Sequence, residues 1–311
     1  MIQEFQDRGV IRPPILLGFA VWFALALASF APRVHLGIIE ILFLLGPWVV
    51  VPLGADLVRG VGASKSSAVR HGALIAAAAL TSVSFFLDNR TAAAWFASSW
   101  LLVCALFAGD GLRRFWVAGT KSFAQFCFAV GEGYLLVAGV WLVASRAGVQ
   151  LLAFHEPIVL LTAVHFHFAG FASAVLAGLA DKAFAGFRGR RFLRAALLAV
   201  VLGPGVLGLA FLLGPKVKLA GALLIALGQL GLAGGMARVG MASKNSGGRW
   251  LLFVAGASVA AGMILAAVWA IGEYPLQAFV NIRQMAEFHG VLNAVGFVVC
   301  GLVGWRVLSS E

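Results

Sequence analysis

Two short clusters of histidine and other polar residues interrupt otherwise apolar sequence. The first contains His165 and His167, and the second contains Glu287, His289 and Asn293. Imidazole titrates near neutral pH, binds metals and haem, and exchanges protons when it is paired with a carboxylate. Because ionisable groups are costly to bury in hydrocarbon, we interpret the two clusters as a candidate functional site.

Two further carboxylates, Glu40 and Glu132, also lie within apolar stretches. A carboxylate in the middle of a membrane span has to be protonated or paired, so it is a candidate for a proton relay or a substrate anchor. The candidate acid–base or proton-relay residues are therefore His165, His167, Glu287 and His289. The candidate substrate-binding residues are Asn293, Glu132 and Glu40, and the candidate metal ligands are His165, His167 and His289.

The spacing within each cluster limits how it can act. Two residues apart on an α-helix means about 200° around the axis, so His165 and His167 cannot face one ion together unless the helix is unwound there. Residues four apart share a face, as His289 and Asn293 do. The predicted site therefore combines one of the first two histidines with His289 and Asn293. The small residues Gly170 and Ala174 follow His167 on its face, which predicts a central helix surrounded by protein.

The elements that position these residues are predicted to be membrane-spanning helices. Of 311 residues, 62% are hydrophobic and only 11% are charged, whereas soluble domains carry about 25% charged residues. The apolar runs are about 20 residues long, which suits helices and exceeds the roughly 9–11 residues of a barrel strand. The sequence thus predicts an all-α, polytopic transmembrane bundle that forms a single integral membrane domain over residues 1–311.

We predict ten spans, at residues 15–31, 36–58, 68–87, 92–112, 123–145, 158–180, 192–213, 217–240, 250–271 and 285–308. Most Lys and Arg residues then fall in loops on one side of the membrane. By the positive-inside rule this side is cytoplasmic, which places both termini in the cytoplasm and the protein in the cytoplasmic (inner) membrane. This topology also explains the net charge of +11 without a nucleic-acid partner.

The same topology assigns depths to the polar residues. The spans at 36–58, 158–180 and 285–308 all run inward from the outer side, so their clusters are expected at a common level in the outer third of the bilayer. Proline and glycine interrupt some spans, as at Gly46-Pro47 and Gly203-Pro204. Such breaks either serve helix packing or open a substrate site, because they leave backbone groups that protein or a water-lined cavity has to satisfy.

The two clusters also resemble a known family. The segments HFHFAGF (165–171) and MAEFHGVLNAVGF (285–297), with a weaker match at 51–54, are similar to the YndJ-like bacterial multi-pass membrane proteins. The resemblance implies an integral membrane protein of a kind sometimes labelled a transporter. It gives added weight to one set of residues, namely His165, His167, Gly170, Glu287, His289, Gly290 and Asn293. It implies no substrate and no mechanism.

Three functions stay open on the sequence. The leading one is a transporter, or a protein that binds a small solute or protons, with an intramembrane His/Glu/Asn site. The second is an intramembrane enzyme that acts on a lipid-soluble substrate by acid–base, metal or haem chemistry. The third is an accessory structural membrane protein. No cofactor is strongly implied, although metal or haem fits histidine chemistry. The bilayer is the one expected partner beyond the solute or substrate, and the oligomeric state is open.

Overall fold

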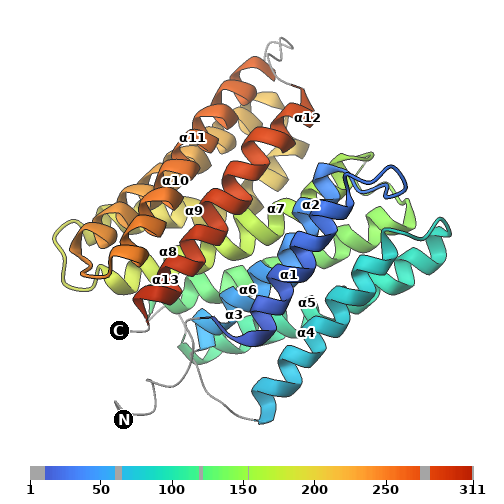
Figure 1. Cartoon of the computed structure of the whole chain (residues 1–311). Coiled ribbons are helices and arrows are strands. Elements are labelled where there is room, and N and C mark those ends of the chain that lie inside the picture. Colours follow the sequence, from blue (N-terminus) through green and yellow to red (C-terminus); the bar gives the residue numbers. More distant parts are fainter. Residues whose placement is uncertain (1–10, 60–64, 119–121, 153, 274–280, 310–311) are drawn as a thin grey trace.

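The chain folds into a bundle of long helices (Figure 1). The computed structural model describes residues 11–59, 65–118, 122–152, 154–273 and 281–309, and these residues form no β-strand. Here α marks α-helix and η marks π-helix. The elements are α1 (Pro13–Ala28), α2 (Ile38–Leu45), η2 (Gly46–Val50), α3 (Val51–Arg59), α4 (Lys65–Ser84), α5 (Arg90–Ala118), α6 (Phe123–Ala147), α7 (Ile158–His165), η4 (Phe166–Ala172), α8 (Ser173–Ala183), α9 (Arg190–Leu213), α10 (Pro215–Ala242), α11 (Ser246–Glu273), α12 (Ile282–Met285), η5 (Ala286–Gly290), η6 (Leu292–Val299) and α13 (Cys300–Leu308).

The predicted fold class is confirmed. Eight continuous helical segments are long and apolar enough to cross a membrane, and two shorter apolar helices, Pro13–Ala28 and Ala68–Ser84, accompany them. Each of the ten predicted spans corresponds to one of these ten segments, with ends that differ by a few residues. The domain prediction also covers residues such as 1–10, which lie outside the described part of the chain.

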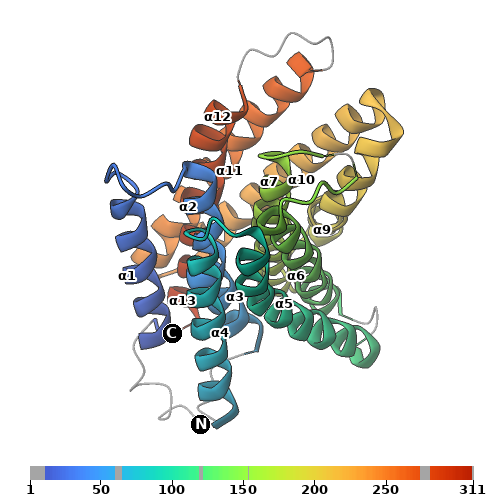
Figure 2. The ribbon, with the colours of Figure 1, turned by 90° about the vertical axis from the view of Figure 1, so that its right-hand side faces the viewer.

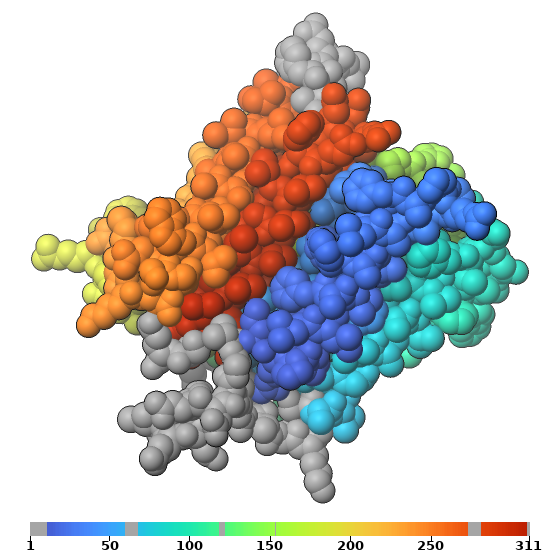
Figure 3. All heavy atoms as spheres, viewed as in Figure 1, coloured from blue at the N-terminus to red at the C-terminus, as the bar shows by residue number. Residues whose placement is uncertain are grey.

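The two ends of the bundle differ in charge. We call the end of the bundle that carries Arg12, Arg59, Arg114, Arg190 and Arg306 the basic face, and the other end the opposite face. Helix α1 begins at the basic face and α13 ends there, close to each other (Figure 1). In the view of Figure 3, α1, α4 and the C-terminal helices form the outer layer of the bundle.

Two helical segments lie at the centre of the bundle. Every residue from 41 to 56, in α2, η2 and α3, is buried, and so is every residue from 170 to 181, in η4 and α8. Small residues make this dense packing possible, since they allow close approach of neighbouring helices. A Cβ atom on Gly54 would lie 2.8 Å from the Phe171 ring, and one on Gly178 would lie 2.4 Å from the Phe128 ring. The prediction of a central helix at 158–180 is therefore confirmed.

The central helices depart from α geometry at one level. Segment η2 interrupts the second span at Gly46-Pro47, η4 interrupts the α7–α8 helix, and η5 and η6 interrupt the last span. Three of these π-helical segments contact one another: η2 touches η4 and η6, and η4 touches η6. In Figure 2 the helices that lead into the breaks, α2, α7 and α12, lie at the same end of the bundle. π-Helix accounts for well under 1% of residues in proteins and often marks functional sites. The meeting of three such breaks therefore points to this part of the bundle as a candidate functional site.

A different device stabilises the proline break in α9. Pro204 lies inside this helix and has no backbone N–H. The hydroxyl of Tyr134, on α6, accepts a hydrogen bond from the backbone N–H of Gly205 at 3.1 Å and donates one to the carbonyl oxygen of Val201 at 2.9 Å. These two backbone groups would bond each other in an unbroken helix. The Tyr134 hydroxyl thus bridges two backbone groups whose direct hydrogen bond is lost beside Pro204. This proline break therefore serves helix packing.

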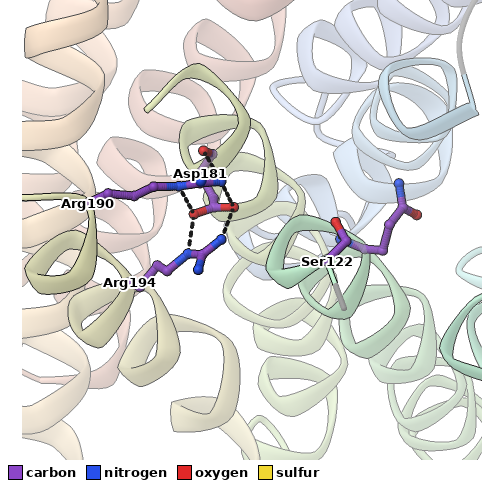
Figure 4. Close-up of polar contacts among 5 residues, drawn as sticks. Ser122, Asp181, Arg190 and Arg194 are labelled. Carbon is purple, nitrogen blue, oxygen red and sulfur yellow. Dashed lines mark hydrogen bonds and ion pairs between the residues drawn. The ribbon is translucent and has the colours of Figure 1, made fainter. Parts of the chain in front are cut away.

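A buried carboxylate holds the turn between α8 and α9. Asp181 is 1% exposed and accepts hydrogen bonds from Arg190 at 2.9 and 3.0 Å and from Arg194 at 2.7 and 3.2 Å (Figure 4). Both guanidinium groups bind the carboxylate with two nitrogens, the geometry in which charge-assisted hydrogen bonds are strongest. Nearby, the hydroxyl of Ser122 caps the start of α6 by accepting from the Gln125 N–H. These contacts fix helix ends at the basic face.

We predict that Asp181→Asn lowers stability by about 1–3 kcal/mol, because a neutral amide leaves two guanidinium groups without a counter-charge. The partial exposure of both arginines keeps the loss below that of a fully buried pair. The measurement is the thermal unfolding midpoint of purified protein in detergent. The matched control is Asp88→Asn, since Asp88 is an exposed residue in a turn. Equal midpoints for the two variants would contradict the prediction.

We also predict that Tyr134→Phe lowers stability by about 1–2 kcal/mol, the cost of two unsatisfied backbone groups on the side of α9 that faces α6. The sharper test is a double-mutant cycle with Pro204→Ala, which restores a backbone N–H at position 204. In the Pro204→Ala background Gly205 can bond Val201 directly, so the effect of Tyr134→Phe should fall by half or more. If the stability changes of the two substitutions simply add, the hydroxyl does not replace the lost backbone hydrogen bond.

Candidate functional site

The three spans that carry the predicted site do meet in space. The π-helical segments of the second, sixth and last spans contact each other, and α2 also contacts η5. A Cβ atom on Gly290 would lie 2.8 Å from the Leu42 side chain, so glycine permits this approach. The sequence prediction of a three-helix meeting point therefore agrees with the packing. Whether a ligand binds there is a separate question, which depends on the individual side chains.

His167 is fully engaged in the core. It is 0% exposed, its Nδ1 lies 2.8 Å from the carbonyl oxygen of Ala163, and its Nε2 accepts a hydrogen bond from the Trp100 indole N–H at 2.8 Å. A carbonyl only accepts, so Nδ1 carries the proton and the ring is neutral. Its Cδ2 would lie 3.2 Å from a Cβ at Gly46, and the Phe43 ring packs against it at 5.2 Å. Neither nitrogen is free for a proton or a metal.

His165 lies on the other side of the same helix and is exposed. Its Nδ1 lies 2.7 Å from the carbonyl oxygen of Leu161, one turn back, so this nitrogen donates. Within the described part of the chain no group hydrogen-bonds its Nε2. The opposite exposure of His165 and His167 agrees with the prediction that residues two apart face different directions.

His289 repeats the pattern of His165 on another helix. Its Nδ1 lies 2.9 Å from the carbonyl oxygen of Gly262 on α11 and therefore donates. The Asn293 amide nitrogen donates to the His289 carbonyl at 2.7 Å, which confirms that the two residues share a face. His165 and His289 thus each hold a proton on Nδ1, and no described group hydrogen-bonds either Nε2.

The two carboxylates predicted near these histidines make no described hydrogen bond with them. Glu287 binds Arg283 at 2.8 Å, one turn earlier, and both side chains are partly exposed. Glu40 lies in the first turn of α2. Both carboxylates lie near the start of their spans, at the opposite face of the bundle.

Glu132 belongs to a different cluster. Its carboxylate is 0% exposed and lies 3.2 Å from Arg59 and 3.1 Å from Arg114. Arg59 also binds Asp110, and Arg114 donates to the Gln125 side chain at 2.8 Å. The sequence made Glu132 a candidate substrate-binding residue. In the structure, arginine side chains from α3 and α5 reach this carboxylate from the basic face and pair with its charge.

Sequence reasoning missed a third polar group, at the basic face. Asp56 is 8% exposed and lies 3.3 Å from Arg12 and 3.4 Å from His71, and it interacts electrostatically with Arg306. No local signal in the sequence links these residues, because each comes from a different helix or from the segment before one.

The geometry limits metal binding. Among the described residues no group of three or more His, Cys, Asp or Glu side chains gathers around one point. His165 and His289 offer two imidazole nitrogens, whereas metal sites built from protein ligands commonly use three or four. The metal and haem predictions for His165, His167 and His289 therefore gain no support, and His167 has no free nitrogen.

Together these features define a multi-pass α-helical membrane protein in which three helices lose α geometry where they meet. The chain belongs to the YndJ-like protein family, whose model matches residues 41–297 and so includes η2, η4 and η5. It is 25% identical over 213 residues to a protein of Bacillus subtilis (strain 168) described as "Uncharacterized membrane protein YndJ". The match covers 68% of this chain and 38% of that relative's length. No solved structure matches the chain.

The two histidines of the first cluster should differ sharply in their effect on stability. We predict that His167→Ala lowers stability by about 2–4 kcal/mol, because it opens a cavity and leaves the Trp100 N–H unsatisfied. His165→Ala, the matched control on the same helix, should change it by less than about 0.5 kcal/mol. Thermal unfolding of both variants in detergent is the measurement. A larger loss for His165→Ala would reverse the two assignments.

Proposed function

We propose that the protein is a transporter of protons or of a small hydrogen-bond-donating solute, with His165 and His289 as the binding pair. The proposal rests on one observation, which is that the two imidazoles have the same hydrogen-bonding arrangement. Each donates Nδ1–H to a backbone carbonyl and presents a free Nε2 lone pair, on helices that meet at π-helical breaks. An Nε2 lone pair accepts a proton or a hydrogen bond from a solute.

The role of Asn293 in this proposal is to position His289. Its amide donates to the His289 carbonyl and lies 3.3 Å from Nδ1. A Cβ atom on Gly262 would lie 2.4 Å from the Asn293 amide, so glycine at that place lets α11 approach both residues. The Gly262 carbonyl then holds Nδ1–H, which fixes the tautomer and leaves Nε2 as the acceptor.

The ion pairs at the basic face supply the second part of the proposal, a closed inner barrier. Asp56 with Arg12 and His71, and Glu132 with Arg59 and Arg114, join α1, α3, α4, α5 and α6 there. A site that is exposed on one side and closed by separable contacts on the other suits alternating access. With the orientation predicted from the loop charges, the exposed side is extracellular.

An enzyme is less well supported by the side-chain partners. Acid–base catalysis by histidine generally needs a second proton-transfer group within hydrogen-bond reach. The carboxylates that were candidates for this role, Glu287 and Glu132, are each held by arginine. The free imidazoles therefore have only Asn293 and backbone groups as described hydrogen-bonding neighbours.

The test uses the purified chain in liposomes that enclose a pH-sensitive dye, with a potassium diffusion potential to drive protons inward. We expect wild-type flux at least tenfold above that of the His165→Ala/His289→Ala double variant. His155→Ala is the control, because His155 is exposed before α7. Flux that is equal in wild type and double variant would overturn the proton proposal. Elemental analysis and a visible spectrum of the same preparation would reveal a metal or haem and return the enzyme alternative to first place.

A further inference from the structure

A pocket of about 300 Å³ lies at the basic face, where α8, α10 and α13 end. In Figure 1 the end of α13 lies near the label of the C-terminus. Its walls are mainly apolar and include Phe184, Phe187, Val239 and Trp305, and its polar lining consists of Arg238 and Ser243. The pocket is on a different part of the bundle from the histidine pair and belongs to no function discussed so far.

The charge of the pocket favours an anion. Phe187 packs under the Arg238 guanidinium at 5.8 Å, and no carboxylate in the described part of the chain pairs with this arginine. No acidic residue lines the pocket. The carboxylate at the end of α8, Asp181, is already matched by Arg190 and Arg194. One full positive charge therefore lies at an apolar pocket without a counter-charge among the described residues.

The position favours a lipid. The pocket is built by the last turns of membrane helices, at the end of the bundle where Lys and Arg concentrate. Trp305 forms part of the wall, which is typical of aromatic residues at the level of lipid head groups. Beside the pocket, Met241 is 65% exposed in the last turn of α10. A volume of about 300 Å³ accommodates a head group or the start of a chain, so acyl chains would extend over such exposed apolar side chains.

We infer that this pocket binds the phosphate of an anionic phospholipid through Arg238, with the glycerol and upper acyl chains against Phe184, Phe187 and Trp305. The three helix ends carry partial negative charge, which disfavours an anion within the last turn. Binding of the phosphate therefore depends on the full charge of Arg238. A basic pocket between helix ends at the cytoplasmic level is the arrangement by which membrane proteins select anionic lipids.

The experiment is native mass spectrometry of the purified full chain in detergent, titrated with phosphatidylglycerol, phosphatidylcholine or inorganic phosphate. We expect the first phosphatidylglycerol to bind at least fivefold more tightly than phosphatidylcholine, from about one basic residue's contribution at a membrane surface. Arg238→Gln should remove this preference. Arg113→Gln, which deletes an exposed charge outside the pocket on the same end of the bundle, should change it by less than twofold.

A second variant blocks the pocket without changing any charge. Ala242→Phe fills the pocket, of which Ala242 is a lining residue, and leaves every arginine in place. It should abolish the phosphatidylglycerol preference as Arg238→Gln does. Equal losses in Arg238→Gln and Arg113→Gln would show diffuse attraction and overturn the site. Full affinity in Ala242→Phe, or displacement of the lipid by millimolar inorganic phosphate, would overturn it as well.

Discussion

Hydrocarbon cannot hydrogen-bond to a peptide group, and this constraint organises the whole molecule. Breaks in a membrane helix are tolerated only where protein or enclosed water satisfies the freed backbone groups. Accordingly, every residue of η2 is buried, and so are five of the seven residues of η4. The third broken helix, at α12 to α13, packs against both. The breaks thus meet because the centre of the bundle is where protein can surround them.

The polar side chains of the bundle form two groups, one towards each face. Towards the opposite face, imidazoles donate to backbone carbonyls and carry no net charge in that state. Towards the basic face, buried carboxylates and guanidinium groups pair across helices. Burying a charge is tolerable only with such pairing, whereas a neutral imidazole needs just its two nitrogens satisfied. Among these three imidazoles, only those of His165 and His289 have an Nε2 that no described group hydrogen-bonds, and this is why we propose them as the binding pair.

Much of the fold could be predicted from the sequence, because the bilayer imposes span length and loop charge directly. The ten helical segments and their limits follow from apolar runs such as 158–180, and the meeting of the three cluster-bearing spans follows from depth and small-residue faces. The partners of individual side chains could not be predicted. Glu132 looked isolated in an apolar span, yet Arg59 and Arg114 reach it from other helices. Asp56 and His71 are likewise brought together only by tertiary packing.

The comparison of His165 with His167 shows what distinguishes a histidine that packs the core from one that can bind a ligand. The two residues are separated by one position, share the motif that marks the family resemblance, and use Nδ1 in the same way. They differ in Nε2: the Trp100 indole occupies it in His167, and no described group does so in His165. Trp100 is 67 positions away in the sequence, so the motif cannot reveal this difference. A histidine pair in an apolar span thus locates a place of interest, and the second ring nitrogen decides which member packs the core and which is free to bind.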